Sequence, residues 1–157
     1  MLRLRASSED DLDRVLAIES ARDTARWLGE TGRAWHERAR SDPDQEHLVA
    51  IVDDVIVGFG VAAGLRSVDR EVELRRMAVD PQCRGRGLGR CLLRSMTRRA
   101  YASGARRVWL DVKPDNRRAL ALYRSEGFEP TEPTEPSRDL IVLVHTPNTS
   151  DRPTRHK

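Results

Sequence analysis

The sequence predicts an α/β domain of the α+β type, in which a mixed, mostly antiparallel sheet is flanked by helices on both faces. Segments with the apolar–polar alternation of strands are interspersed with segments of helical periodicity. Two strand-like segments joined by a pair of aspartates indicate an antiparallel hairpin. A strand, a glycine-rich loop, a helix and a further strand in succession indicate one parallel pair with a right-handed crossover.

The first part of the chain contains one strand and two helices. Leucines alternate with arginines over residues 2–5, which is typical of a short strand. Two serines followed by acidic residues cap a helix expected over residues 9–21, where apolar residues recur at helical spacing. A second, short helix is expected over residues 35–40, and we expect Trp27 and Trp35 to pack in the core or in a lid.

A hairpin and a further strand follow. The aspartate turn lies between strands expected at residues 47–52 and 55–64. Gly58 and Gly60 interrupt the returning strand, which indicates a bulge or a close approach between backbones. The next strand, expected over residues 71–79, changes its alternation near the middle, as a β-bulge would cause.

The second half of the chain alternates helices and strands. An amphipathic helix of about four turns follows the glycine-rich loop from Leu88 and is expected to end at Gly104. A strand is expected over residues 108–112. Asn116 is a suitable N-cap for another helix, which Gly127 is expected to end.

The chain is expected to end with one more strand and a tail. Residues 129–136 repeat glutamate and proline, which predicts an extended spacer. The last strand is expected over residues 140–144. We therefore predict a single domain over residues 1–146, followed by a disordered tail at residues 147–157.

The composition favours a soluble cytoplasmic protein without a membrane partner. Of the 157 residues, 38% are hydrophobic and 34% are charged, and no apolar run is long enough to cross a bilayer. No basic segment followed by an apolar stretch opens the chain, so no export signal is expected. Cys83 and Cys91 are too close for a disulfide framework and have no companion ligands, so no metal site is expected.

Basic residues concentrate in one segment, although the formal net charge is only +3. Arginines crowd residues 84–99, which would suit a nucleic acid, a phosphorylated small ligand or a solvated helix face. Two phenylalanines and two tyrosines leave little for stacking on bases. A nucleic-acid partner is therefore the less favoured hypothesis.

The loop at residues 84–89, Arg-Gly-Arg-Gly-Leu-Gly, has the composition of an anion-binding backbone. Glycines let successive amide groups converge on a ligand, and the start of the following helix adds its positive dipole end. A dinucleotide fingerprint is excluded because its third glycine position falls on Arg90, and no P-loop Gly-Lys-Ser/Thr is present.

This segment resembles the GNAT superfamily of N-acetyltransferases. The loop at residues 84–89 matches the family's pyrophosphate motif Gln/Arg-x-x-Gly-x-Gly/Ala. Residues 74–81 resemble the family's bulged fourth strand, and residues 108–112 resemble its fifth strand. The helix that follows carries the family's characteristic residues, Asn116, Ala119, Leu122, Tyr123, Gly127 and Phe128. The resemblance covers about residues 71–128.

The resemblance implies acetyl-CoA as co-substrate, bound where the sheet opens between the fourth and fifth strands. The loop would hold the pyrophosphate, and the fourth-strand backbone would pair with the pantetheine arm, the Val79 N–H facing the developing oxyanion. The implied cofactor contacts are Met77, Ala78, Val79, Arg84, Gly85, Arg86, Gly87, Leu88, Gly89, Arg90, Asn116, Ala119 and Tyr123.

Two side chains are implied to be catalytic. Tyr123 matches the family tyrosine that gives a proton to the departing CoA thiolate; a core tyrosine is the alternative. Glu73 lies where some members place the base that deprotonates the amine, and Glu71, on the same strand face, or a water chain are alternatives. Asn116 can serve as helix cap, as cofactor contact, or as both. A cysteine nucleophile is not favoured, because neither thiol has a clear activating base.

The implied activity is direct transfer of acetyl from acetyl-CoA to a primary amine of a small molecule, protein or peptide. The acceptor, which would contact residues 22–45 and 129–138, is not specified: polyamine-like or antibiotic amines, amino-acid derivatives and protein N-termini stay open. Glutamates in the spacer would attract a cationic amine or are simply solvated. The alternatives are a catalytically idle CoA-binding sensor and a basic nucleic-acid-binding module. Both a monomer and a homodimer are compatible with the sequence.

Overall fold

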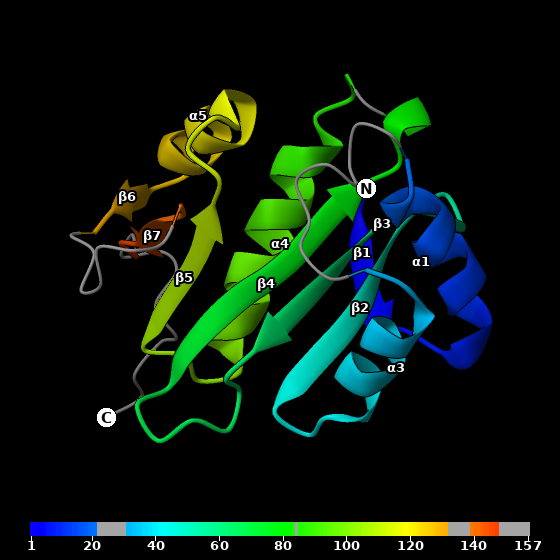
Figure 1. Ribbon diagram of the computed structural model, residues 1–157, viewed down its shortest axis with the longest axis horizontal. Helices are drawn as coiled ribbons and strands as arrows, with labels where there is room; N and C mark the ends of the chain where they lie inside the picture. The colour runs from blue at the N-terminus through cyan, green and yellow to red at the C-terminus, as the bar shows by residue number, and fades with distance from the viewer. Residues whose placement is uncertain (22–30, 84, 132–138, 148–157) are drawn as a thin grey trace.

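The computed structural model describes residues 1–21, 31–83, 85–131 and 139–147 (Figure 1). In chain order the elements are β1 (Arg3–Ala6), η1 (Glu9–Asp11), α1 (Leu12–Glu19), α3 (Arg33–Ser41), β2 (Gln45–Val52), β3 (Val55–Ala63), β4 (Glu71–Val79), η2 (Pro81–Cys83), α4 (Leu88–Ala102), β5 (Arg107–Val112), α5 (Arg117–Ser125), β6 (Phe128–Pro130) and β7 (Ile141–His145). The helix expected over residues 9–21 is divided into the 3-10 turn η1 and α1.

The strands of the described residues form one mixed sheet in the order β1-β2-β3-β4-β5-β7-β6. Neighbouring strands are antiparallel except for β4 and β5, which run parallel. Helices α4 and α5 pack against one face of the sheet, and α1 and α3 cover the other (Figure 1). The predicted fold class is confirmed, including the parallel pair on either side of α4.

Each face of the sheet has its own apolar core. On the α4 face, Leu92, Leu93 and Met96 of the helix are about 1% exposed and pack against the sheet. On the other face, α1 contributes Val15 and Ile18, which pack with the β3 and β4 side chains of the second core. The apolar residues of both helices recur at helical spacing, so the sequence periodicity directly determines which side of each helix is buried.

A β-bulge in β4 changes which face of the sheet its side chains occupy. Against β3, Leu74 pairs with Ala62 and Arg76 pairs with Val61, so Arg75 is the extra residue. Before the bulge Leu74 belongs to the α4 core, whereas after it Ala78 belongs to the α1–α3 core. The predicted bulge is confirmed, and it turns Arg76 towards α1 and α3.

The sheet opens between β4 and β5. Their parallel ladder joins only residues 71–73 to residues 107–109. Beyond this point β5 pairs with β7 on its other side, and Figure 1 shows β4 and β5 diverging towards the end where α4 begins. The backbone edge of β4 that faces β5 is therefore released from sheet pairing over its second half, at least within the described residues.

The glycines of β3 allow close packing. A Cβ atom on Gly58 would lie 2.6 Å from the Ala78 carbonyl oxygen, and one on Gly60 would lie 2.7 Å from the Met96 sulfur. Gly58 thus brings β3 close to the backbone of β4, as predicted, whereas Gly60 makes room for the side chain of Met96.

One prediction for the end of the domain is wrong. Residues 129 and 130 do not belong to a spacer, because they form β6 with Phe128 and pair with β7. The buried ring of Phe128 fixes this short strand against the core. The predictions for Trp27, for residues 132–136 and for residues 148–157 lie outside the described residues. No helix in the described part of the chain is long and apolar enough to cross a membrane.

Candidate active site

A cleft of about 1140 Å³ occupies the opening between β4 and β5. Residues 74–79 of β4 form one wall, and residues 110–113 at the end of β5 form the other together with α5. Gly85 and residues 87–89 close one end. The divergence of the two strands therefore creates a groove that leads from the middle of the sheet to the glycine-rich loop.

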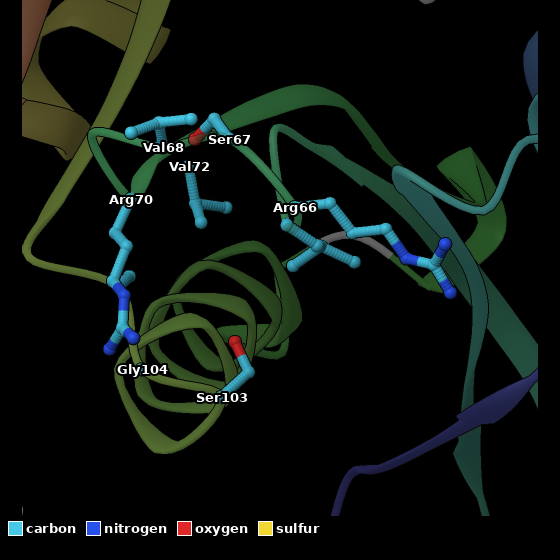
Figure 2. Close-up of a pocket in the computed structure, with 9 residues that line it drawn as sticks. Arg66, Ser67, Val68, Arg70, Val72, Ser103 and Gly104 are labelled. Carbon is cyan, nitrogen blue, oxygen red and sulfur yellow. The ribbon is translucent and has the colours of Figure 1, made fainter.

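A second hollow, of about 510 Å³, lies at the other end of β4 and α4, beside Val72 and Ser103 (Figure 2). Arg66 and Arg70 are at its edge, but their guanidinium groups extend away from each other (Figure 2). They do not converge on a common anion, and the C-terminal end of a helix repels negative charge. The larger cleft is the better candidate.

The glycine-rich loop has the conformation expected of an anion-binding backbone. Gly85 and Gly87 have φ angles of 83° and 72°, in the left-handed region that favours glycine. A Cβ atom on either residue would meet nothing within 4 Å, so the space above both is open. Gly87 is the N-cap of α4, whose first amide groups have no partner within the helix. Arg84 lies outside the described residues.

Three of the predicted cofactor contacts are β4 residues. Met77, Ala78 and Val79 all line the cleft, directly after the bulge. They lie on the part of β4 that has separated from β5, so their backbone is available on the cleft side in the described structure. This arrangement permits a ligand to add strand-like hydrogen bonds to β4.

Helix α5 and its N-cap form much of the opposite wall. Asn116, Ala119 and Tyr123 all line the cleft. The Asn116 side-chain oxygen accepts a hydrogen bond from the Ala119 N–H at 3.3 Å, so the predicted N-cap is confirmed. Asn116 thus has a structural role and also borders the cleft.

Tyr123 is half-buried and makes no hydrogen bond among the described residues. Burial, and to a smaller extent the carboxylate of Asp111, raise the pKa of its hydroxyl to about 12. Tyr123 is consequently protonated at neutral pH. A protonated hydroxyl on the wall of a cleft can donate a proton to a developing anion.

The structure does not place two of the predicted loop arginines on the cleft wall. Arg86 is exposed on the loop. Arg90 points to the end of α5, where its guanidinium group contacts Ser125 at 2.8 Å and forms an ion pair with Glu126. Arg94 joins the same carboxylate at 2.7 Å. Arg90 therefore connects α4 to α5 in this structure.

Glu73 is placed beside the cleft and is not one of the residues that line it. It is the last β4 residue paired with β5, and its carboxylate forms an ion pair with Arg75 at 3.2 Å. Glu71 forms an ion pair with Arg107 at 3.3 Å. Glu73, the predicted general base, thus lies where β4 and β5 begin to separate, one residue before the β4 segment that borders the cleft.

Sequence reasoning missed most charged residues of the cleft wall. The wall includes five basic and two acidic side chains, namely Arg75, Arg76, Lys113, Arg117, Arg118, Asp111 and Asp115. The available signal was the basic cluster around the start of the helix capped by Asn116. Such a surplus of positive charge suits a ligand with several phosphate groups. Nowhere in the described residues do three or more His, Cys, Asp or Glu side chains form a metal-binding group.

Comparisons with known proteins identify this class of cleft. The model of the acetyltransferase (GNAT) family matches residues 12–128, and the chain belongs to this family. Mycothiol acetyltransferase of Jonesia denitrificans is 36% identical in an alignment 143 residues long, which covers 83% of this chain and 45% of that protein. N-alpha-acetyltransferase RimI of Mycobacterium tuberculosis is 39% identical over 93 residues, which are 59% of this chain and 57% of that protein. The chain thus spans about half the length of these curated relatives.

A solved structure gives the same fold. Spermidine N-acetyltransferase from Vibrio cholerae, in complex with CoA and spermine, superposes with a TM-score of 0.75 at 18% identity. The match covers 91% of this chain and 92% of that one. The chain therefore has the fold of the GNAT family.

Proposed function

We propose that this protein is an N-acetyltransferase that passes acetyl from acetyl-CoA directly to the primary amine of a small molecule, protein or peptide. The observation that carries the proposal is the cleft between β4 and β5, which has a left-handed glycine loop at one end and Tyr123 on its wall. Membership of the acetyltransferase family supports it.

The residues present fit CoA. The amide groups of the loop and of the first turn of α4 would hold the pyrophosphate, because the first amide groups of a helix have no acceptor within that helix. The space above Gly85 and Gly87 is open to such a ligand. Basic side chains of the wall, such as Lys113 and Arg117, would balance the phosphate charge. The backbone of residues 77–79 would pair with the pantetheine arm. Acetyl-CoA supplies an acetyl group activated as a thioester.

Residues of the chain would remove a proton from the amine, stabilise the oxyanion and give a proton to the departing thiolate. An amine attacks only after it loses its proton, and Glu73 is the proposed base, acting through water because it lies outside the cleft wall. The Val79 N–H would stabilise the oxyanion that forms at the carbonyl. Tyr123, kept protonated by its raised pKa, would give a proton to the departing thiolate.

The acceptor would be a primary amine. The similar proteins include a mycothiol acetyltransferase, an N-alpha-acetyltransferase and a spermidine N-acetyltransferase. Arg94 and Arg99 of α4 form ion pairs with Glu126 and Glu46. Because these arginines are already neutralised, α4 is less suited to a nucleic-acid backbone than its sequence indicates.

A ligand-induced shift of the melting temperature tests the proposal. Acetyl-CoA and CoA at saturating concentration should raise it by several degrees, whereas NADH and ATP should not, because only CoA matches both the loop and the β4 backbone. Acetyl transfer is then tested with a panel of polyamines, aminoglycosides and peptides with free N-termini, by measuring the free thiol of the CoA that is released. Stabilisation by CoA without transfer to any amine would indicate a CoA-binding sensor. No stabilisation by either CoA species would falsify the proposal.

A further inference from the structure

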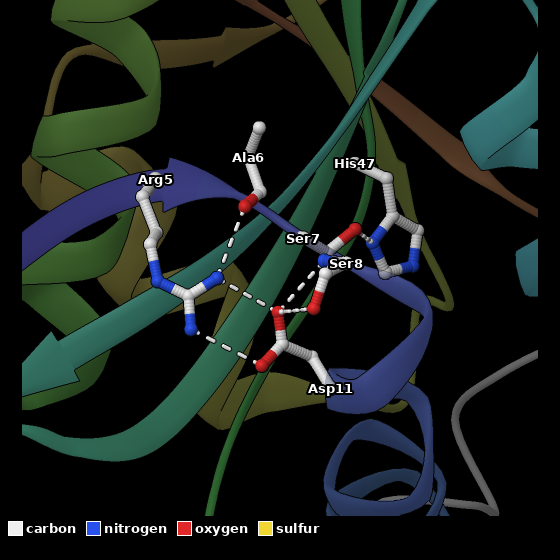
Figure 3. A network of polar contacts seen from close by, with 6 residues as sticks. All are labelled: Arg5, Ala6, Ser7, Ser8, Asp11 and His47. Atoms are coloured by element: carbon white, nitrogen blue, oxygen red, sulfur yellow. Dashed lines mark hydrogen bonds and ion pairs between the residues drawn. The ribbon is translucent and has the colours of Figure 1, made fainter.

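A chain of buried polar side chains connects the cleft to the opposite face of the sheet. Arg76 of β4 donates to the carboxylate of Glu19 from α1 at 3.2 Å, and the other oxygen of that carboxylate is bonded to His36 of α3. His36 Nδ1 lies 2.8 Å from Nε2 of His47, and His47 Nδ1 lies 2.7 Å from the Ser7 hydroxyl. Figure 3 shows the outer end of this chain, at Ser7 and His47.

The charges of this chain are deeply buried. Glu19 is 2% exposed, His36 is fully buried, and Arg76 is 8% exposed. Burial, assisted by the charges of His36 and Arg40, lowers the pKa of His47 to about 4, so His47 is neutral at neutral pH. Burying an ion pair generally costs as much free energy as it returns, and an apolar pair of the same volume would often be as stable. The pair of Glu19 and Arg76 therefore calls for an explanation other than stability.

Arg76 is the member of the chain that reaches the cleft. It lines the cleft wall next to Met77, and the bulge at Arg75 turns it to the face covered by α1 and α3. Its guanidinium carbon lies 3.8 Å from the centre of the Trp35 ring, so it is stacked as well as paired. A positive charge is thus fixed beside the proposed site of acetyl transfer, and Glu19 neutralises it from behind.

We propose that Glu19 is a positioning residue that compensates the charge of Arg76, so that a cationic amine can enter the acceptor side of the cleft. The inference rests on the proposed function and specifies its substrate class, an amine that arrives protonated. Glu19 touches no substrate and acts through Arg76. His36 holds the Glu19 carboxylate, and Trp35 holds the guanidinium group, so both charges keep fixed positions.

Removing the carboxylate should impair binding of the amine and leave binding of CoA intact. Glu19→Gln removes one negative charge beside Arg76, so this part of the cleft wall becomes more positive by one charge and repels an ammonium group. We expect the dissociation constant of a cationic amine to rise about tenfold or more, with a smaller rise at high salt. The dissociation constant of acetyl-CoA should stay within about twofold, since the loop and residues 77–79 are unchanged.

Calorimetric titration of the full-length protein with CoA bound measures this directly. The probes are spermidine and an alanine-initiated peptide, titrated into wild type, Glu19→Gln and the double variant Glu19→Gln/Arg76→Met. The double variant removes one negative and one positive charge, so the net charge of the pair is that of wild type and the variant should recover most of the wild-type affinity. Glu46→Gln is the matched control: it removes the partner of Arg99, an ion pair outside the cleft, and should change nothing.

Equal affinities of wild type and Glu19→Gln would overturn the inference, as would a wild type that binds neither amine. A double variant as weak as the single one would also overturn it, because the pair itself, and not its charge balance, would then be needed. If Glu19→Gln does not fold, the double variant is compared with wild type, and an affinity for spermidine about tenfold weaker than that of wild type would overturn the inference. Failure of CoA to bind would instead refute the proposed acetyl transfer.

Discussion

At the scale of single residues, position relative to the cleft separates the predicted roles. Tyr123 and Asn116 border the cleft, as a role towards CoA requires. Arg90 instead forms an ion pair with Glu126, because α5 packs against α4 near the loop. Its side-chain direction depends on the docking of another helix and could not be predicted from the local sequence. The roles of Glu73 and Tyr123 in catalysis stay predictions.

Tyr123→Phe tests the proton donor. Because the pKa of about 12 keeps the hydroxyl protonated up to high pH, its loss should lower kcat by about a hundredfold across the neutral range. Affinity for acetyl-CoA should change little. Steady-state kinetics measure both. Tyr101→Phe is the control: it loses the bond to His145 at 2.9 Å, which should cost about 1 kcal/mol of stability and leave kcat unchanged. An unchanged rate in Tyr123→Phe would remove it as the acid.

Glu73→Gln tests the base. We expect kcat/KM for the amine to fall about a hundredfold at neutral pH. The deficit should shrink as pH rises, because the free amine then forms without a base. Glu71→Gln, which loses an equivalent ion pair on the same strand, should match wild type. A pH–rate profile of Glu73→Gln identical to wild type would assign the base elsewhere, and a defect in Glu71→Gln would assign it there.

Asp11 is expected to control stability in acid. Its carboxylate accepts from Arg5 at 2.7 Å and from the Ser8 N–H at 2.7 Å (Figure 3), which lowers its pKa to about 2. Because the folded pKa lies below the unfolded value of 3.8, the stabilisation is complete above about pH 4 and is lost as pH falls through about 2.

Asp11→Asn should therefore lower the free energy of unfolding by about 1–2 kcal/mol at pH 7, allowing for the exposure of Arg5, and by little at pH 2. Urea unfolding at both pH values measures the difference. Asp13→Asn, whose ion pair with Arg33 is solvent-exposed, should change stability by less than about 0.5 kcal/mol at either pH. Equal losses in the two variants would contradict this account of Asp11.

At the scale of elements, local signals in the sequence predicted several features of the strands and helices correctly. The change of alternation in β4 predicted its bulge, and the Asn116 cap predicted the start of α5. β6 was not predicted, because a strand of three residues has no periodicity and is defined by pairing with β7. The pair of Glu19 and Arg76 was equally invisible, since its members are 57 residues apart and meet only when α1 packs on β4.

The glycine loop is tested as an element by paired substitutions. Gly87 and Gly104 lie beyond the two ends of α4, with φ angles of 72° and 104°. Alanine at either position should cost about 1 kcal/mol of stability, because both φ angles are left-handed. Only Gly87→Ala should also weaken CoA binding, by about tenfold, as its methyl group and altered backbone face the cleft. Titration of CoA into both variants measures the contrast, and equal affinities would argue against the loop as the pyrophosphate site.

At the scale of the molecule, the fold class and the element order were predictable because both depend on periodicity. The GNAT resemblance over residues 71–128 also located the cleft, since the family motifs lie along its walls. The acceptor side depends on how α1 and α3 meet β4, and that information is distributed over residues remote in sequence. The cofactor side of the cleft was therefore predictable from local motifs, whereas the acceptor side was not.

The ladder between β4 and β5 is only three residues long, so a small change of angle there is amplified along the two strands. Val79 lies six positions after Glu73, a distance of about 20 Å along the strand. A tilt of about 5° at the ladder would therefore move the loop end of the cleft by nearly 2 Å. The angle between β4 and β5 depends on the few side chains at this ladder, among them Trp109, which pairs with Glu73. A substitution there that barely alters local packing would change the distance between the two walls where CoA is held.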